Sequence, residues 1–358
     1  MRPRTSLLVL ALAAGAWPAR AHAQDWLVLQ GIAETEAWAS DSGSRLLTRN
    51  AGKPGVVGRL RVFTGLAPSR AFQVIALTEL EGGNAYTRNE HVTLEALVAR
   101  AVASPALILE AGRIPSPVGA FAPRRLAPVN PLIGEPDAYP TRYPWGAQVS
   151  GKVTLLDYRL ALVDLAPVHD GYSPPPGSSW RGVIGAGVTP FIGAHFGGTY
   201  TRGPYLGGSV ITALQPGVDW KSFTQEIFAL DGRVSRGYVD LHAEWARSTH
   251  EVPTVGTIPG VAWYAELKYT WTPRFFTAGR FQQNDYPFIR PINANRWIGA
   301  RANFYAGEVG VGWRMARGVL LKVSYQKDRW DAPQLSGQAV AVQVSWQFDA
   351  TEWVQRKQ

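Results

Sequence analysis

The stretch from Gln338 to Phe348 alternates strictly between two kinds of side chain. Every second residue is apolar, with aromatic residues at one end, and the residues between them are small or polar. Successive side chains of a β-strand point to opposite faces, so this period of two predicts a strand with one apolar face and one polar face. In a soluble protein the oily face would pack on a core, whereas in a transmembrane barrel it would meet lipid.

The same alternation recurs in several other segments, and in each of them the charged residues occupy only one face. Aromatic residues stand at both ends of an apolar face, as Trp263 and Trp271 do, which is typical of the girdles of transmembrane barrels. The alternating segments include Phe72–Glu81, Val239–Trp245, Val261–Trp271 and Val319–Gln326.

The connections between these segments alternate between short turns and long loops, with long loops expected at 249–259 and 284–293 among others. Counting along the chain gives about sixteen strands, with Asn295 to Met315 taken as one long strand bent at 306–308. The sequence therefore predicts an all-β fold: a transmembrane, antiparallel up-and-down β-barrel over residues 24–349, with short periplasmic turns and long external loops.

The N-terminus has the pattern of a secretory signal peptide. Basic residues precede a short apolar run, and Ala21-His22-Ala23 supplies the small residues that a signal peptidase needs, so we expect residues 1–23 to be removed. Removing them lowers the formal charge from +9 to about +6, and no block of basic residues suggests nucleic-acid binding. The chain has no cysteine, so no disulfide can stabilise it. Residues 350–358 are expected to form a polar tail.

The run from Leu107 to Phe121 ends a strand in Gly-Arg and enters the next loop through Pro-x-Pro-x-Gly. This entry into the loop and the aromatic last strand make the chain resemble Gram-negative outer-membrane porins. The resemblance is loosely to the group that includes the phosphate-selective porins. About ten residues follow Phe348, whereas the closing aromatic of such barrels is usually the last residue. The resemblance implies a water-filled, homotrimeric channel in the outer membrane, in contact with lipid and lipopolysaccharide.

The loop between Pro115 and Pro144 contains eight prolines, which makes it stiff and unable to extend the sheet. Because about thirty residues is long for a simple connection, we expect this segment, 115–144, to fold into the barrel and narrow it, as the third loop of porins does. The charged residues expected at this constriction are Arg113, Arg124, Arg125, Glu135, Asp137 and Arg142.

Seven more cations lie on faces that we assign to the lumen, because an arginine facing lipid near the midplane would cost about 2–4 kcal/mol. Arg59 and Arg61 have no acidic residue near them in sequence, so we expect them to be the cations most available to solutes. These charges predict passive diffusion of small hydrophilic solutes with a mild preference for anions. The seven are Arg59, Arg61, Lys152, Lys268, Arg280, Arg301 and Lys322.

Other functions have weaker support. We expect no enzyme activity: a membrane-embedded hydrolase needs a serine oriented by a histidine, and no Gly-x-Ser-x-Gly motif occurs. No cofactor or metal is expected, since no histidines stand at ligand spacing, and His195 and His242 are expected to line the lumen. A non-conducting barrel serving as adhesin or scaffold, and a soluble β-sandwich, remain alternatives.

Overall fold

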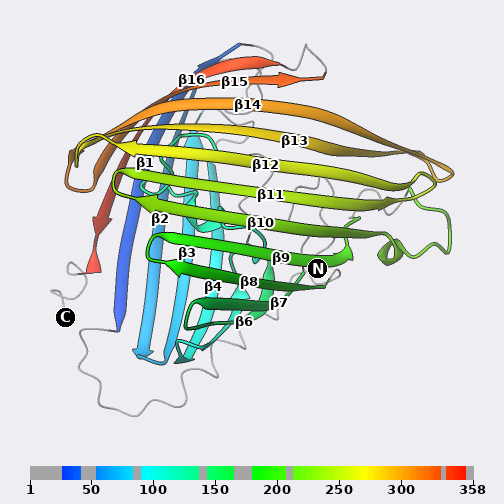
Figure 1. Cartoon of the computed structure of the whole chain (residues 1–358), viewed down its shortest axis with the longest axis horizontal. Coiled ribbons are helices and arrows are strands. Elements are labelled where there is room, and N and C mark those ends of the chain that lie inside the picture. The colour runs from blue at the N-terminus through cyan, green and yellow to red at the C-terminus, as the bar shows by residue number, and fades with distance from the viewer. Residues whose placement is uncertain are drawn as a thin grey trace.

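The computed structural model describes residues 26–41, 54–83, 90–136, 143–164, 180–206, 213–331 and 336–351. Sixteen antiparallel strands form one closed barrel, in which each strand pairs with its neighbours in sequence and β16 pairs with β1 (Figure 1). The strands are β1 (Leu27–Ser40), β2 (Gly55–Ser69), β3 (Phe72–Gly83), β4 (Glu90–Ser104), β5 (Leu107–Arg113), β6 (Trp145–Val153), β7 (Leu156–Val163), β8 (Arg181–Phe191), β9 (Ala194–Pro204), β10 (Thr224–Arg236), β11 (Val239–Val252), β12 (Gly256–Thr270), β13 (Phe275–Asn293), β14 (Arg296–Ala316), β15 (Val319–Trp330) and β16 (Gly337–Asp349).

The strand that first suggested a barrel shows how the two faces are used. On β16 the apolar residues Val340, Val344 and Trp346 are 41–48% exposed, whereas Gln343 and Ser345 between them are at most 4% exposed. In a closed barrel the covered face is the lumen, so the oily residues point outward and the polar ones inward. The predicted all-β barrel is confirmed.

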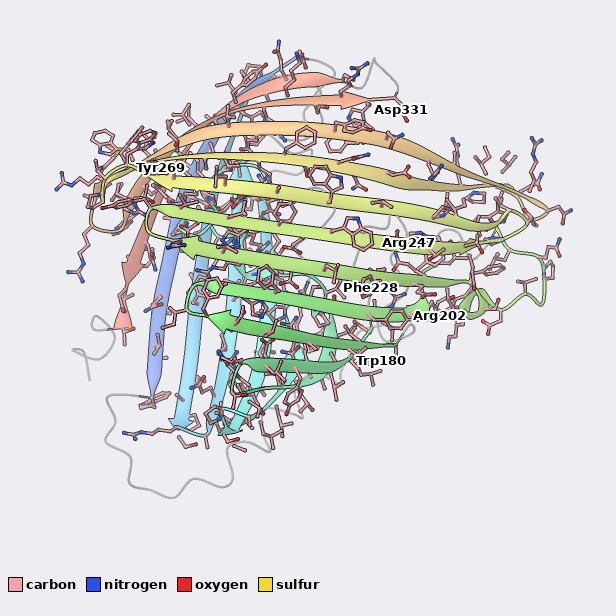
Figure 2. All side chains as sticks on the ribbon, viewed as in Figure 1. Trp180, Arg202, Phe228, Arg247, Tyr269 and Asp331 are labelled. Carbon is pink, nitrogen blue, oxygen red and sulfur yellow. The ribbon has the colours of Figure 1, made fainter. Side chains whose placement is uncertain are left out.

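The outer surface carries an apolar band edged by aromatic residues. Trp263 of β12 and Trp271, the residue after that strand, are eight positions apart, which is about 20 Å of height once strand tilt is included, close to the lipid-facing band of about 25 Å. Tyr269 lies near the turns, and Trp180 and Phe228 lie toward the other end (Figure 2). These aromatic residues mark the two borders of the lipid.

Seven connections are tight turns at one end of the barrel, as expected, but the other end differs from the prediction in two places. The segments 249–259 and 284–293 were expected to be long loops, and this is wrong: β11 continues to Val252 and β13 to Asn293, each followed by a tight turn. At this end the hairpins reach farther than β8 and β9 (Figure 1). The outer face of β11 becomes polar there, and prolines at 287 and 291 of β13 resemble loop residues, so the alternation that marks a strand is lost. The β11–β12 turn is tight because Thr254 and Gly256 adopt positive φ values of 63° and 97°.

The long strand over 295–315 is confirmed as β14, although no bulge interrupts its pairing at 306–308. The projecting hairpins are stabilised by the β9–β10 connection, whose Tyr205 and Leu206 are buried against Val252 and Trp297. Two short 3₁₀ helices, η1 (Ala122–Arg124) and η2 (Trp220–Ser222), complete the secondary structure described. In the described residues no helix combines the length and the apolarity that a membrane crossing requires. The expected signal peptide and most of the polar tail lie outside the described residues.

Candidate functional site in the barrel lumen

After β5 the chain turns into the barrel instead of away from it. Residues 114–134, which we call the inner loop, touch inward-facing side chains on strands that lie on opposite sides of the wall. Arg159 of β7 donates to the Pro117 carbonyl (2.9 Å), and Glu244 of β11 accepts from the Ala120 amide (3.0 Å). On the far side, Lys322 of β15 donates to loop carbonyls. Only a segment inside the lumen can make all three contacts.

The end of the inner loop is fixed by buried charges. Glu308 of β14 accepts from the amides of Ile133 (3.1 Å) and Gly134 (2.9 Å), and Lys322 donates to the carbonyls of Asn130 (3.0 Å) and Leu132 (2.8 Å). A side chain at Gly134 would collide with Glu308, since a Cβ there would lie 2.6 Å from its Oε2. Charge-assisted hydrogen bonds in a covered site are strong, so this end of the loop is held rigidly.

Arginines complete the anchoring. Arg280 of β13 pairs with Glu308 (2.7 Å) and with Glu266 of β12 (3.2 Å), and it also donates to the Gly134 carbonyl. From the loop itself, Arg124 pairs with Glu266 and Arg125 pairs with Glu95 of β4. Every carboxylate in this set is therefore engaged by at least one cation.

An apolar layer joins the beginning of the inner loop to the wall. Ile114, Val118 and Phe121 are at most 5% exposed and pack with inward residues of β4, β8, β10, β11 and β12. The Phe121 ring meets Tyr264 edge to face, with centroids 6.0 Å apart. Apolar packing of this kind excludes water from part of the lumen cross-section.

Arg59 and Arg61 are not the available cations that we expected. Arg59 pairs with Glu36 (3.0 Å) and Glu81, and Arg61 pairs with Glu79 (2.5 Å) and Glu34. The acids come from β1 and β3, which are distant in sequence but lie directly beside β2 in the register. The expectation failed because sequence distance does not report cross-strand neighbours.

Arg301 was expected in the lumen and instead lies on the outer face. It shares that face with Tyr305 and Val309, pairs with Asp285 at 3.0 Å, and its side chain is 55% exposed. No lipid penalty applies, because Arg301 lies beyond Tyr305 on the part of β14 that projects past the aromatic border.

The remaining predicted residues do not all face the lumen: the register pairs Arg113 with the outward residues Leu97 and Trp145, so Arg113 stands on the outer face of β5. Arg113 donates to the Tyr143 carbonyl at 3.0 Å, and Lys268 pairs with Asp240 at 3.5 Å. Lys152 is exposed near the turns, and Glu135 is exposed at the end of the inner loop. Asp137 and Arg142 lie outside the described residues.

A cavity of about 420 Å³ remains between the inner loop and the wall formed by β7 to β12. On the loop side its lining includes Gly119, Ala120 and Pro123, which carry little side-chain bulk. His195 and His242 line it, as expected, and so does Glu244. Four further charged residues in the lining were not predicted from the sequence: Asp157, Arg159, Asp231 and Arg233.

Part of the wall of this cavity is formed by glycines. We call this part the glycine bay, and it consists of Gly185 and Gly187 of β8 and Gly197 of β9. Asp157 and Asp231 lie beside it. A Cβ on Gly187 would lie 2.7 Å from Asp157 Oδ2, and one on Gly197 would lie 2.7 Å from Asp231 Oδ2. Absence of side chains at these positions is what leaves room for the two carboxylates. Glycine is frequent between residues 182 and 198, but the sequence alone does not distinguish glycines that open the wall from glycines that serve strand packing or bending.

His195 lies between the two carboxylates of the bay. Its Nε2 is 3.0 Å from Asp157 Oδ1, and its Nδ1 is 3.7 Å from Asp231 Oδ1. Both ring nitrogens therefore face acids, whereas a hydrolase would need one of them to face a serine hydroxyl. Among the described residues, no group of three His, Cys, Asp or Glu side chains is arranged to hold a metal ion.

No protein-family model matches the chain, and the comparison with curated proteins also gives no match. Solved structures do resemble it over most of its length. OmpT of Vibrio cholerae is 10% identical with a TM-score of 0.58, covering 90% of this chain and 97% of its own, and its loop L8 deletion mutant has a TM-score of 0.56 at 10% identity, covering 90% and 99%. OmpF of Salmonella typhi in complex with daunomycin is 13% identical with a TM-score of 0.59, covering 90% and 97%. At this identity the likeness shows the fold, and together with the lipid-facing band it identifies the chain as an outer-membrane β-barrel of the Gram-negative type.

Proposed function

We propose that this barrel is a porin-like diffusion channel, through which small hydrophilic solutes move down their gradient between the inner loop and the β7–β12 wall. The observation that carries the proposal is the 420 Å³ cavity, which small residues on both facing surfaces help to keep open. Gly119 and Ala120 stand on the loop side, and the glycine bay stands on the wall side. Pockets of about 300–1,000 Å³ accept small molecules, so this space is large enough for a small hydrophilic solute.

The mild anion preference expected from the sequence loses most of its basis, since Arg59, Arg61 and Arg280 are neutralised by carboxylates. The charges that line the cavity are of both signs, with Arg159 and Arg233 set against Asp157 and Asp231. We therefore propose a channel of low charge selectivity, because neighbouring fields of opposite sign cancel over a few ångströms.

We propose transport and not catalysis, because His195 faces two carboxylates and the described residues that line the cavity include no serine or cysteine. A second candidate is a non-conducting scaffold, favoured by the apolar layer of Ile114, Val118 and Phe121 across the lumen. The two candidates differ in whether ions cross the barrel.

Purified protein reconstituted into a planar bilayer distinguishes these functions. The channel proposal predicts stepwise conductance and a reversal potential near zero under a KCl gradient. Complete absence of steps, with the barrel shown to be folded and inserted, would support the scaffold. A strongly positive or negative reversal potential would contradict low charge selectivity while leaving the channel itself intact.

A further inference from the structure

The charged residues of the glycine bay are arranged in rows across the wall. Asp157, Gly187, Gly197, Asp231 and Glu244 are successive register partners from β7 to β11, so three acids and two glycines form one row. The next row toward the turns is formed in the same way by His195, Arg233 and His242. An acidic row and a row formed by the Arg233 cation and two histidines thus face the same cavity, one above the other.

The distance between the rows follows from strand geometry. Asp231 and Arg233 are two residues apart on β10, and two residues of a strand span about 7 Å. An extended peptide advances by about 3.3–3.6 Å per residue, so a dipeptide also spans about 7 Å between its ammonium and carboxylate groups. The spacing of the two rows therefore matches the charge separation of a dipeptide.

The acids are accessible to a solute. The side chains of Asp157 and His195 are 35% and 36% exposed, and that of Asp231 is 13% exposed. In each aspartate, the Oδ2 atom lies over a bare glycine of the bay. The His195 ring occupies the space between the Oδ1 atoms, and an ammonium group reaches the two aspartates from the cavity that both of them line.

A buried hydroxyl also lines the cavity without a partner. Thr199 is 7% exposed, and its Oγ1 has no hydrogen-bond partner among the described residues. It lies on β9, two residues from Gly197, on the side of the acidic row away from Arg233. Buried hydroxyls are ordinarily satisfied, so a water or a solute in the cavity can supply the partner of this one.

We propose that the glycine bay recognises zwitterionic solutes of dipeptide length, with the ammonium at Asp157 and Asp231 and the carboxylate at Arg233 and His242. A simple ion of either sign is attracted by one row and repelled by the next, since the rows are closer together than the screening length of about 8 Å. A zwitterion of matching length is attracted by both. This inference rests on the proposed diffusion channel and specifies its solute class.

Liposome swelling with reconstituted protein tests it. The swelling rates of diglycine and of an uncharged pentose of similar size are compared, with glycine and triglycine as shorter and longer zwitterions. We expect diglycine to exceed the pentose by about threefold, a ratio that corresponds to weak charge contacts in water. Glycine and triglycine, corrected for their size, should show a smaller advantage.

Three variants localise the effect. The double variant Asp157→Asn, Asp231→Asn and the single variant Arg233→Gln should each bring the diglycine to pentose ratio close to one while pentose still enters. The matched control is Arg202→Gln, which removes an exposed arginine that pairs with Glu251 on the outer face. This control should keep the wild-type ratio.

The possible failures are distinguishable. Failure of pentose to enter liposomes containing wild-type protein would overturn the channel proposal itself. Pentose entry with equal rates for diglycine and pentose, or a raised ratio that survives in both bay variants, would overturn zwitterion recognition alone.

Discussion

The two halves of the lumen are built differently, although both consist of the same alternating strands. Along β1–β3 and β13–β15, inward charges pair with each other or with the inner loop, and Lys322 and Glu308 are at most 3% exposed. Along β7–β11, glycines leave the wall open and Asp157 and His195 remain about one-third exposed. We call β1–β3 with β13–β15 the closed half, because its charges hold the inner loop. We call β7–β11 the open half, because its charges stay accessible to solute.

The largest expected effect comes from breaking the closed half. Glu308→Ala removes the acceptor for the Ile133 and Gly134 amides and a partner of the buried Arg280, and disrupting a buried ion pair costs about 3–5 kcal/mol. The barrel should unfold at a lower temperature in detergent, and single-channel conductance should rise as the loop end detaches. Arg202→Ala, which breaks an exposed pair worth about 0–1 kcal/mol, is the control. Wild-type stability and conductance in Glu308→Ala would show that the loop is held elsewhere.

A smaller effect is expected from filling the open half. Gly187→Val adds side-chain atoms where a Cβ already lies 2.7 Å from Asp157 and His195, so the bay narrows and conductance should fall by more than half. Gly182→Val on the same strand is the matched control, because its Cβ meets nothing within 4 Å and its position faces outward. Equal conductance in both variants, measured in the same bilayer, would mean that solutes do not pass the bay.

The smallest effect concerns charge selectivity. Arg233→Gln removes an exposed cation of the open half and should shift the reversal potential toward cation selectivity by a modest amount. Arg59→Gln removes the same charge from the closed half, where it leaves Glu36 and Glu81 with one partner fewer. That variant should lose about 1–3 kcal/mol of stability and keep its selectivity. A selectivity shift in Arg59→Gln together with unchanged selectivity in Arg233→Gln would contradict the roles assigned to the two halves.

Much of the fold could be predicted because it depends on a local rule. Alternation along Gln338–Phe348 and its counterparts determines which side chains meet lipid, and this requires no knowledge of the partner strand. The rule failed where the surroundings changed. Beyond the lipid border β13 carries prolines at 287 and 291, so the hairpin was taken for a loop, and the polar outer face of β14 caused Arg301 to be taken for a lumen residue.

The candidate site was less predictable because its residues are far apart in the sequence. The pairing register of neighbouring strands brings them together. Arg59 and Glu81 are 22 residues apart, and Asp157 and His195 are 38 apart. The glycines of the bay gave a visible signal, but a glycine in a strand has the same appearance whether it serves packing, bending or an opening in the wall.

By itself, the sequence determined that this chain forms a barrel with an oily outside and a polar inside, since side-chain direction in a strand is fixed by the backbone at every residue. Only the tertiary structure decided which lumen charges are neutralised and where space remains, because ion pairing and cavity shape depend on atoms from strands and a loop that closure of the barrel brings together.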